Sequence, residues 1–347
     1  MAENSNISWT EATWNPTVGC SIVSPGCTNC YAMKMADRIQ VMDRNRAAKQ
    51  YMAGSSHYHG TTKVVNGNPV WTGTVNLAPD QVLLAPLSRK KPTIYFVDSM
   101  SDLFHERVPD EWIDRIFAVM ALCPQHTFQV LTKRSARMRE YVTELTRDTR
   151  NWRQVTDIRM ASFMGEVAAL AGWTRDDPQC LEGLKNIDPD DGRWPMKNLW
   201  LGVSCEDQER ADERVPDLLA TPAAKRFVSA EPLLGPIDFQ FMQSPFGHHN
   251  GWPGVYNSLN GSWWPAVGDA DEEYRNREEG LPRLDWVISG GESGPGFRPT
   301  DIAWHEAIMR QCKDAGVAYH FKQDSAFRPG QRGRASDELW ACKAVPR

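Results

Sequence analysis

The chain alternates short apolar runs with stretches in which apolar residues recur every three or four positions. The apolar runs are rich in β-branched residues and show little polar alternation, as expected of strands that are covered on both faces. We therefore expect strands at residues 17–19, 73–77, 93–98, 127–132, 199–204, 226–230, 286–289 and 318–322.

Between these runs, the spacing of the apolar residues predicts amphipathic helices. The three clearest stripes are those of Met35, Ile39 and Met42, of residues 112–120, and of residues 304–312. The third stripe lies between Asp301, a residue type that caps helix N-termini, and Gly316, a residue type that ends helices.

Strands that alternate with helices indicate a parallel sheet. About eight such strands in 347 residues predict an α/β fold, a (β/α) barrel that is complete or partial and TIM-like. We expect a single domain over residues 1–347. Three segments break this alternation and are expected to be irregular insertions, at about residues 44–70, 141–197 and 240–283. The second of them holds a helical pattern at about residues 160–171.

Composition narrows the setting of the protein. No run of 18 apolar residues exists, so no membrane span is expected, and the polar N-terminus does not resemble a secretory signal. We therefore expect a cytoplasmic protein. The net charge of −5 lacks the basic excess of a dedicated nucleic-acid-binding domain, so any contact with nucleic acid is expected to come from a local patch.

Three of the eight cysteines, Cys20, Cys27 and Cys30, lie in one loop directly before a helical pattern. Three thiolates in one loop can hold three irons of a 4Fe–4S cube and leave the fourth iron open. A zinc site is the alternative, and it needs a fourth ligand such as His57 or His59. A disulfide does not suit a reducing cytosol or an odd number of thiols.

Polar residues also follow the predicted strands, where the reactive groups of βα barrels lie. They include Asp98, Ser99, Asp102, Lys133, Arg134, Cys205, Glu206, Asp207, Glu231, Gly290, Gly291, Glu292, Lys322 and Gln323. Several such residues together predict a polar binding site. For Lys133 and Glu231 individually, a buried ion pair is an equally good explanation, and residues 290–294 also suit a phosphate held by backbone N–H groups.

Several segments together resemble a known family. The segments at residues 14–31, 99–105, 131–134, 229–238, 289–294 and 321–323 are similar to a phage-encoded three-cysteine family of unknown function with a radical-SAM-like barrel. The position of the three-cysteine loop, before the first helix of the predicted barrel, resembles that of the cysteine loop in the radical S-adenosylmethionine (SAM) superfamily. The spacing departs from that superfamily's common pattern, because six residues separate Cys20 from Cys27 and the aromatic Tyr31 follows Cys30.

The resemblance implies an enzyme with a 4Fe–4S cluster on the three cysteines and SAM on its open iron. Such an enzyme cleaves SAM reductively, with an electron donor such as flavodoxin or ferredoxin, and abstracts hydrogen from a substrate. The side chains and backbone expected to bind SAM are those of Ser99, Lys133, Arg134, Glu231, Gly290, Gly291, Glu292, Lys322 and Gln323. The candidate catalytic residues are Cys205, Lys133 and Glu231.

The substrate is open, and phage origin of the family suggests a nucleotide or a nucleic acid. Trp252, Trp263 and Trp264 are expected either to stack bases or to anchor their loop. An alternative function is a non-catalytic barrel, stabilised by zinc or a cluster, that binds a phosphate-bearing ligand or a partner protein. A weaker alternative is a hydrolase that uses Asp98, Glu231 and Glu292 as acid and base.

Overall fold

The computed structural model describes residues 5, 7–50, 56–146, 156–174, 176–187, 195–243, 254–265 and 281–346. Seven of its strands are hydrogen-bonded in one sheet, whose spatial order is also their order in the sequence. They are β1 (Ala12–Trp14), β6 (Ile94–Val97), β7 (Thr127–Thr132), β8 (Leu199–Ser204), β9 (Lys225–Ala230), β13 (Trp286–Ser289) and β14 (Ala318–Phe321). The predicted α/β class with a parallel sheet is confirmed, and this strand order is compatible with a partial barrel.

The chain forms two compact units, which are described separately below. The first comprises Met1–Arg137 and Tyr141–Trp200, and the second comprises Met138–Glu140 and Leu201–Arg347. Strands β1, β6 and β7 belong to the first unit, and β9, β13 and β14 belong to the second. The expectation of a single domain stays a prediction.

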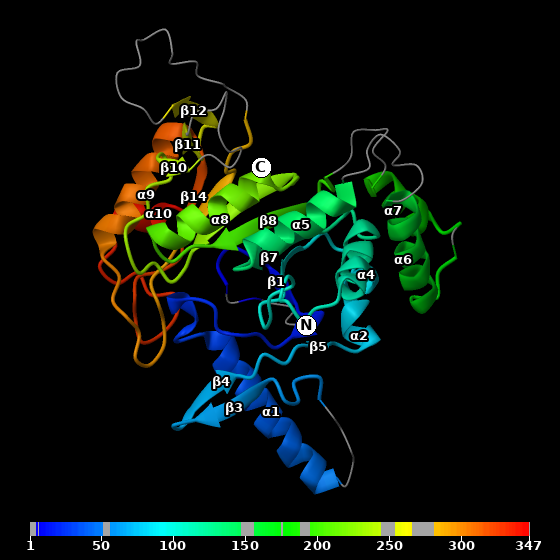
Figure 1. Ribbon diagram of the computed structural model, residues 1–347. Coiled ribbons are helices and arrows are strands. Elements are labelled where there is room, and N and C mark those ends of the chain that lie inside the picture. The colour runs from blue at the N-terminus through cyan, green and yellow to red at the C-terminus, as the bar shows by residue number, and fades with distance from the viewer. Residues whose placement is uncertain are drawn as a thin grey trace. The chain divides into compact units, whose positions relative to one another are not determined.

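Aromatic side chains form the centre of the first unit. The ring of Trp14 lies 5.5 Å from that of Phe128, which stacks on Tyr95 at 5.6 Å. Helix α4 (Asp110–Ala121) begins directly after Pro109, as the sequence indicates, and buries the predicted stripe at residues 112–120 except for Trp112, which is half-buried. Helices α6 (Thr156–Leu170) and α7 (Pro178–Ile187) pack on α4 (Figure 1). The segment at residues 141–197 is therefore largely helical in its described part.

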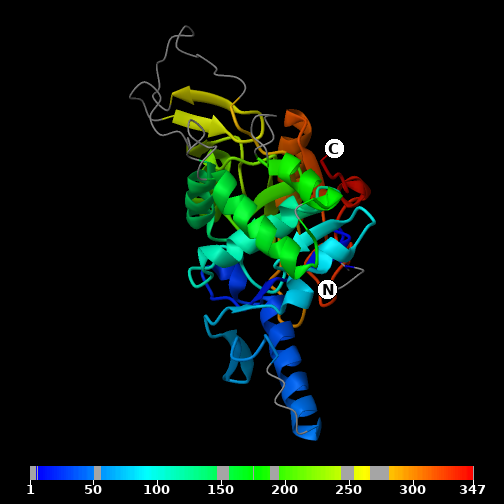
Figure 2. The ribbon, with the colours of Figure 1, turned by 90° about the vertical axis from the view of Figure 1, so that its right-hand side faces the viewer.

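Helix α1 (Tyr31–Gln50) follows the cysteine loop, and the hairpin of β3 (Thr62–Val65) and β4 (Asn68–Trp71) lies beside it (Figures 1 and 2). The irregular insertion expected at residues 44–70 is wrong in its described part, which holds the end of this helix and most of the hairpin. The predicted apolar stripe of α1 is right only at Ile39, which packs against a buried cluster that includes Met33, Ala36 and the hairpin residue Trp71. Met35 and Met42 of the stripe are exposed.

The second unit packs α8 (Gln208–Ala220), α9 (Ile302–Ala315) and α10 (Asp337–Ala341) with its strands. The predicted ends of α9 are confirmed. The Asp301 carboxylate accepts a hydrogen bond from the Ala303 amide, and Gly316 adopts the left-handed conformation that ends the helix. Phe227, Trp286 and Phe321 are buried between these elements.

Two of the eight predicted strands lie outside the parallel sheet. Residues 17–19 and 73–77 contribute β2 (Thr17–Val18) and β5 (Asn76–Leu77), which pair with each other in antiparallel fashion. The edge strand β1 was not predicted. The segment at residues 240–283 was expected to be irregular, and its described part contains an antiparallel sheet of β10 (Met242–Gln243), β11 (Gly254–Asn257) and β12 (Ser262–Pro265).

Two very short helices, α2 (Asp80–Leu83) and α3 (Ala85–Ser88), precede β6, and α5 (Ser135–Thr146) follows β7. Across the described residues, none of the helices is both long enough and apolar enough to cross a membrane. The cytoplasmic location stays a prediction.

Candidate metal centre

The first half of the cysteine loop is fixed by Gly19. This residue has a φ of +98°, and a Cβ there would lie 2.1 Å from the carbonyl oxygen of Thr74, so only glycine fits. The Gly19 carbonyl accepts a hydrogen bond from Ser101 Oγ at 2.8 Å, and its N–H donates to the Met100 carbonyl at 3.1 Å. These contacts hold Cys20 beside the segment that follows β6.

The second half of the loop is a short helical turn. Residues Pro25–Cys27 form a 3-10 turn, and the Cys30 amide donates to the Cys27 carbonyl at 3.3 Å. Helix α1 begins at Tyr31, whose hydroxyl donates to the Ser99 carbonyl at 3.0 Å. Cys27 therefore ends the 3-10 turn, and Cys30 directly precedes helix α1.

The three thiols are neighbours, and none of them is in a disulfide. All three are half-buried, and Cys20 and Cys30 pack against the same apolar cluster, which includes Val18 and Met33. The pKa of the Cys20 thiol is raised to about 12, mainly by burial and then by the Asp102 carboxylate. Cys30 and Cys27 raise this pKa further, while the Arg134 guanidinium opposes the rise. Electrostatic effects of this kind require the groups to lie close together.

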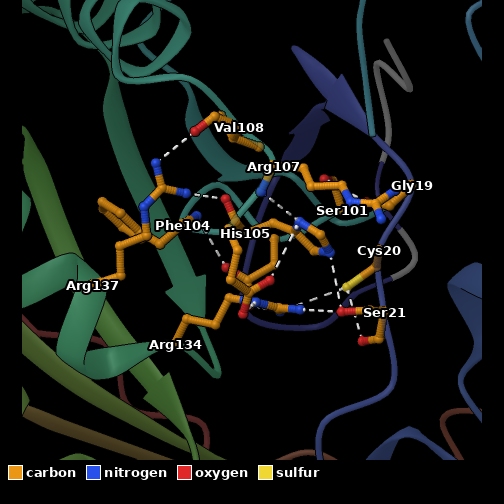
Figure 3. Close-up of polar contacts among 12 residues, drawn as sticks. Gly19, Cys20, Ser21, Ser101, Phe104, His105, Arg107, Val108, Arg134 and Arg137 are labelled. Carbon is orange, nitrogen blue, oxygen red and sulfur yellow. Dashed lines mark hydrogen bonds and ion pairs between the residues drawn. The ribbon is translucent and has the colours of Figure 1, made fainter. Parts of the chain in front are cut away.

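The guanidinium of Arg134 connects the cysteine loop to two carboxylates. Its Nη1 donates to Asp102 Oδ2 at 3.0 Å and to Cys20 Sγ at 3.8 Å. Its Nη2 donates to Ser21 Oγ at 2.7 Å, and its Nε donates to Glu106 Oε1 at 2.8 Å. Figure 3 shows the Arg134 side chain directed toward Cys20 and Ser21. Every edge of this guanidinium thus has a partner, so a role as a free SAM-carboxylate ligand would require these contacts to change.

Asp102 and His105 complete the polar surroundings of the loop. The Asp102 carboxylate also accepts from Thr132 Oγ1 at 2.6 Å and from the Lys133 amide at 3.0 Å. His105 Nε2 lies 3.0 Å from Ser21 Oγ (Figure 3). Ser21, His105 and Glu106 were not identified from the sequence as site residues, although His105 lies in the segment 99–105 that carries the family resemblance.

Asp98 is a buried residue of the framework. Its carboxylate accepts hydrogen bonds from the Thr17 amide at 3.0 Å and from Thr17 Oγ1 at 2.9 Å. Burial raises the pKa of Asp98 to about 8 despite these hydrogen bonds, and Asp102 contributes to the rise. A buried carboxyl that holds the cysteine loop in place is not presented to a substrate, so this geometry does not favour the hydrolase alternative.

The other predicted cofactor-binding residues of the first unit have different surroundings. Ser99 Oγ donates to Asn15 Oδ1 at 3.0 Å. Lys133 is half-exposed, and no partner for its ammonium group is found among the described residues. The role of Lys133 as a ligand of SAM stays a prediction.

In the second unit, the structure brings Glu231 and Lys322 together. Glu231 Oε1 lies 3.1 Å from Lys322 Nζ, and Glu231 Oε2 accepts from Ser229 Oγ at 3.0 Å. A Cβ on Gly290 would lie 2.6 Å from Glu231 Oε1, so the glycine makes room for this carboxylate. The pair follows the parallel strands β9 and β14 and keeps some exposure to solvent.

Glu292 and Gln323 are occupied by contacts within the second unit. The Glu292 carboxylate accepts from the Arg298 amide at 2.7 Å and from Arg298 Nη2 at 2.5 Å. Gln323 Nε2 donates to the Gly291 carbonyl at 2.9 Å, and its Oε1 accepts from the Gly330 amide at 2.7 Å. Both side chains therefore hold loops together in this structure.

Cys205 and Trp263 are both buried. Cys205 has no exposed surface, and its amide donates to the Ser229 carbonyl at 3.0 Å, so its predicted hydrogen-donating role would require an opening of the fold. Trp263 is 7% exposed and anchors β12 in place of presenting a stacking surface. Trp252 lies outside the described residues, as does the side chain of Trp264.

The arrangement defines a class of protein, a parallel α/β protein with three free thiols in one loop and a buried arginine beside them. A comparison of the sequence with protein-family models shows the family of the chain. A family model described as "Protein of unknown function (DUF5131)" matches residues 4–340, and the chain belongs to this family. No curated protein and no solved structure matches the chain.

A single metal ion requires several ligands that converge on one point. Among the residues that the structure describes, no three His, Cys, Asp or Glu side chains are arranged in this way. A 4Fe–4S cube makes a different demand, since each thiolate binds a different iron and the three sulfurs surround the cube. Three neighbouring thiols with an arginine donor beside one of them fit that demand.

Proposed function

We propose that this protein is a radical SAM enzyme that binds a 4Fe–4S cluster through Cys20, Cys27 and Cys30. The observation that carries the proposal is the set of three free, half-buried thiols, which lie close enough together that Cys30 and Cys27 contribute to the raised pKa of the Cys20 thiol. Three cysteine ligands leave one iron of the cube open to SAM. When bound, such a cluster supplies the electron that cleaves the carbon–sulfur bond of SAM and so starts hydrogen abstraction from a substrate.

The chain's own residues would prepare the loop for this cofactor. Gly19 fixes the backbone before Cys20, and the apolar cluster beside Cys20 and Cys30 keeps water from one side of the loop. The Arg134 guanidinium offers a positive charge to the Cys20 sulfur, which favours its thiolate form. An electron donor such as flavodoxin or ferredoxin is part of the proposal.

The predicted SAM-binding residues differ in whether their side chains are open to a ligand. Lys133 has an unpaired ammonium group within the described part of the chain, and Glu231 with Lys322 forms a partly exposed pair of opposite charges. A pair of this kind suits a ligand that carries both an amine and a carboxylate, as the methionyl group of SAM does. Arg134, Glu292 and Gln323 make structural contacts, and their predicted roles would add to these.

The proposal is tested by anaerobic reconstitution with iron and sulfide, followed by reduction and EPR spectroscopy with and without SAM. We expect a 4Fe–4S signal that changes when SAM is added. The single variants Cys20→Ala, Cys27→Ala and Cys30→Ala should each lose the signal. Cys342→Ala is a matched control, because Cys342 is also a half-buried free thiol but lies outside the loop.

Two results would contradict the proposal. One is a colourless protein that binds zinc through the same cysteines, which would support the non-catalytic metal-stabilised barrel. The other is a cluster whose EPR signal does not respond to SAM, since an open iron that SAM cannot reach would not start the reaction.

A further inference from the structure

The loop that follows β14 displays an unusual set of side chains. Residues 327–334, here called the Phe327 loop, have the sequence Phe-Arg-Pro-Gly-Gln-Arg-Gly-Arg, and all eight are exposed. Phe327 is 63% exposed, although burial of a phenylalanine side chain is normally favourable. Three of the eight residues are arginines and none is acidic.

The base of this loop is firmly held. The Gly330 amide donates to Gln323 Oε1 at 2.7 Å, and the Asp324 amide donates to the Gln331 carbonyl at 3.0 Å. Gly333 has a φ of +56°, and a Cβ there would lie 2.4 Å from Asp324 Oδ2, so the loop needs glycine at this position. A loop built in this way loses little conformational entropy when it binds a ligand.

The three arginines of the loop have different partners. Arg334 donates to both oxygens of the buried Asp324 carboxylate, and Arg332 pairs with Asp337 at 2.6 Å. Within the described part of the chain, the Arg328 guanidinium has no partner. The loop therefore presents an exposed aromatic ring and, at the next position in the sequence, a guanidinium without a partner among the described residues.

We propose that the Phe327 loop binds single-stranded nucleic acid, with the Phe327 ring stacked on a base and Arg328 bonded to a phosphate. Single strands are bound by aromatic side chains that stack on bases and by cations that follow the backbone. A guanidinium matches the geometry of a phosphate. An acidic peptide would satisfy the arginines but would leave the exposed ring without a base to stack on.

The position of the loop also suits this ligand. The loop begins five residues after Lys322, which pairs with Glu231 beyond the ends of β14 and β9, and the Ala326 amide donates to the Glu292 carbonyl at 3.1 Å. A single-stranded nucleic acid bound to the Phe327 loop would thus be held beside the residues that follow the β-strands of the second unit. The binding itself is independent of a cluster, whereas the further idea that the bound strand is the substrate rests on the proposed radical SAM function.

The test uses the full chain and fluorescein-labelled single-stranded DNA and RNA of mixed sequence, about 20 nucleotides long, so that a site of several nucleotides is covered. Binding is followed by fluorescence anisotropy. We expect the wild-type chain to bind and its affinity to fall between about 50 and 200 mM salt, because phosphate contacts release counterions. The double variant Phe327→Ala/Arg328→Gln should bind at least about tenfold more weakly, since loss of one stacked base alone weakens binding severalfold.

Matched controls come from the same unit. Phe241 is 61% exposed and Arg310 is exposed on α9, so Phe241→Ala/Arg310→Gln removes an equal ring and an equal charge elsewhere. Its affinity should equal that of the wild type. The inference is overturned if the wild-type chain does not bind, if the two double variants bind equally, if duplex DNA binds more tightly than single strands, or if polyglutamate displaces the oligonucleotide as well as unlabelled oligonucleotide does.

The same titration on a Cys20→Ala/Cys27→Ala/Cys30→Ala chain separates this inference from the proposed function. Retained binding in that chain, together with a failed EPR test, would leave the nucleic-acid site standing while the radical chemistry falls. A normal EPR response with no oligonucleotide binding would leave the proposed radical chemistry standing and would overturn the nucleic-acid site.

Discussion

Arg134 Nη1 lies 3.8 Å from the sulfur of Cys20, and the same nitrogen lies 3.0 Å from Asp102 Oδ2. The arginine side chain is 6% exposed, so this contact is largely shielded from solvent. A buried guanidinium that donates to a cysteine sulfur influences both the charge on that sulfur and the stability of the fold.

The first prediction concerns the reduction potential of a bound cluster. Loss of the Arg134 donor should make the potential more negative, because hydrogen bonds to a ligating sulfur stabilise the more electron-rich state. A hydrogen bond to a charged group contributes about 1.5 kcal/mol, and 59 mV corresponds to about a tenfold change for one electron, so we expect a shift on the order of 50 mV. The measurement is an EPR-monitored redox titration.

This titration compares Asp102→Asn with Asp102→Asn/Arg134→Gln, so that neither chain leaves the Asp102 carboxylate buried and unpaired. Arg107→Gln is the charge-matched control, because Arg107 is exposed and no hydrogen bond to a cysteine sulfur is found for it among the described residues. Equal potentials in the two Asp102 variants would show that the contact between Arg134 and Cys20 has no influence on the cluster.

The second prediction concerns stability of the chain without metal. Arg134→Met leaves the Asp102 carboxylate, which is 7% exposed, without its ionic partner. Removal of one member of a buried ion pair costs about 3–5 kcal/mol. We expect a loss of this size in the free energy of unfolding measured with urea, and a change below about 0.5 kcal/mol for the exposed Arg107→Met. Similar losses in both variants would contradict the assigned burial.

The third prediction concerns Gly19. Gly19→Ala should destabilise the protein strongly and abolish cluster binding, because the added Cβ would meet the Thr74 carbonyl oxygen at 2.1 Å. Gly67→Ala is the control, since Gly67 also has a positive φ of +76° but has open space around it. The left-handed conformation alone costs about 1–2 kcal/mol, so the excess loss in Gly19→Ala over Gly67→Ala, measured by urea unfolding, reports the clash. No excess would mean that the backbone approach is looser than the structure indicates.

The fourth prediction concerns pH. Because burial raises the pKa of Asp98 from 3.8 to about 8, the native chain keeps a proton on this carboxyl at pH values where the unfolded chain has released it. The unfolded state then binds fewer protons, and this group makes the free energy of unfolding fall as pH rises from about 4 to 8. The slope contributed by one proton is about −1.4 kcal/mol per pH unit.

Asp98→Asn removes this contribution and preserves an acceptor for the Thr17 amide. Asparagine also tolerates the left-handed backbone at this position, where φ is +57°. Urea unfolding at a series of pH values should therefore give a variant whose stability relative to the wild type improves steadily between pH 4 and 8. Parallel stability curves would show that Asp98 is ionised in the folded protein.

Much of the architecture was readable in the sequence because the buried strands carry continuous apolar runs. Residues 127–132, 199–204 and 286–289 coincide with β7, β8 and β13. The ends of α9 followed from Asp301 and Gly316, whose effects on the backbone are local. The cysteine loop was equally visible, since three thiols and the glycine before them lie close together along the chain.

Local pattern failed where the partner lies far away in sequence. The three residues of β1 are too few to show a period, and the strand exists because it pairs with β6, more than 80 positions later. In α1 the stripe of Met35, Ile39 and Met42 predicted the buried side correctly only at Ile39. The hairpin decides that side, because Trp71 belongs to the same buried cluster as Met33 and Ala36.

The sequence by itself determined the alternating α/β pattern, the helix ends and the three cysteines, because each of these depends on neighbours within a few positions. Only the tertiary structure decided what surrounds them. Arg134 and Cys20 are 114 positions apart, and whether an arginine serves as a free ligand or as a buried donor depends on which chain segments pack around it. The same holds for Phe327, whose exposure no local pattern reveals and only the packing of the second unit fixes.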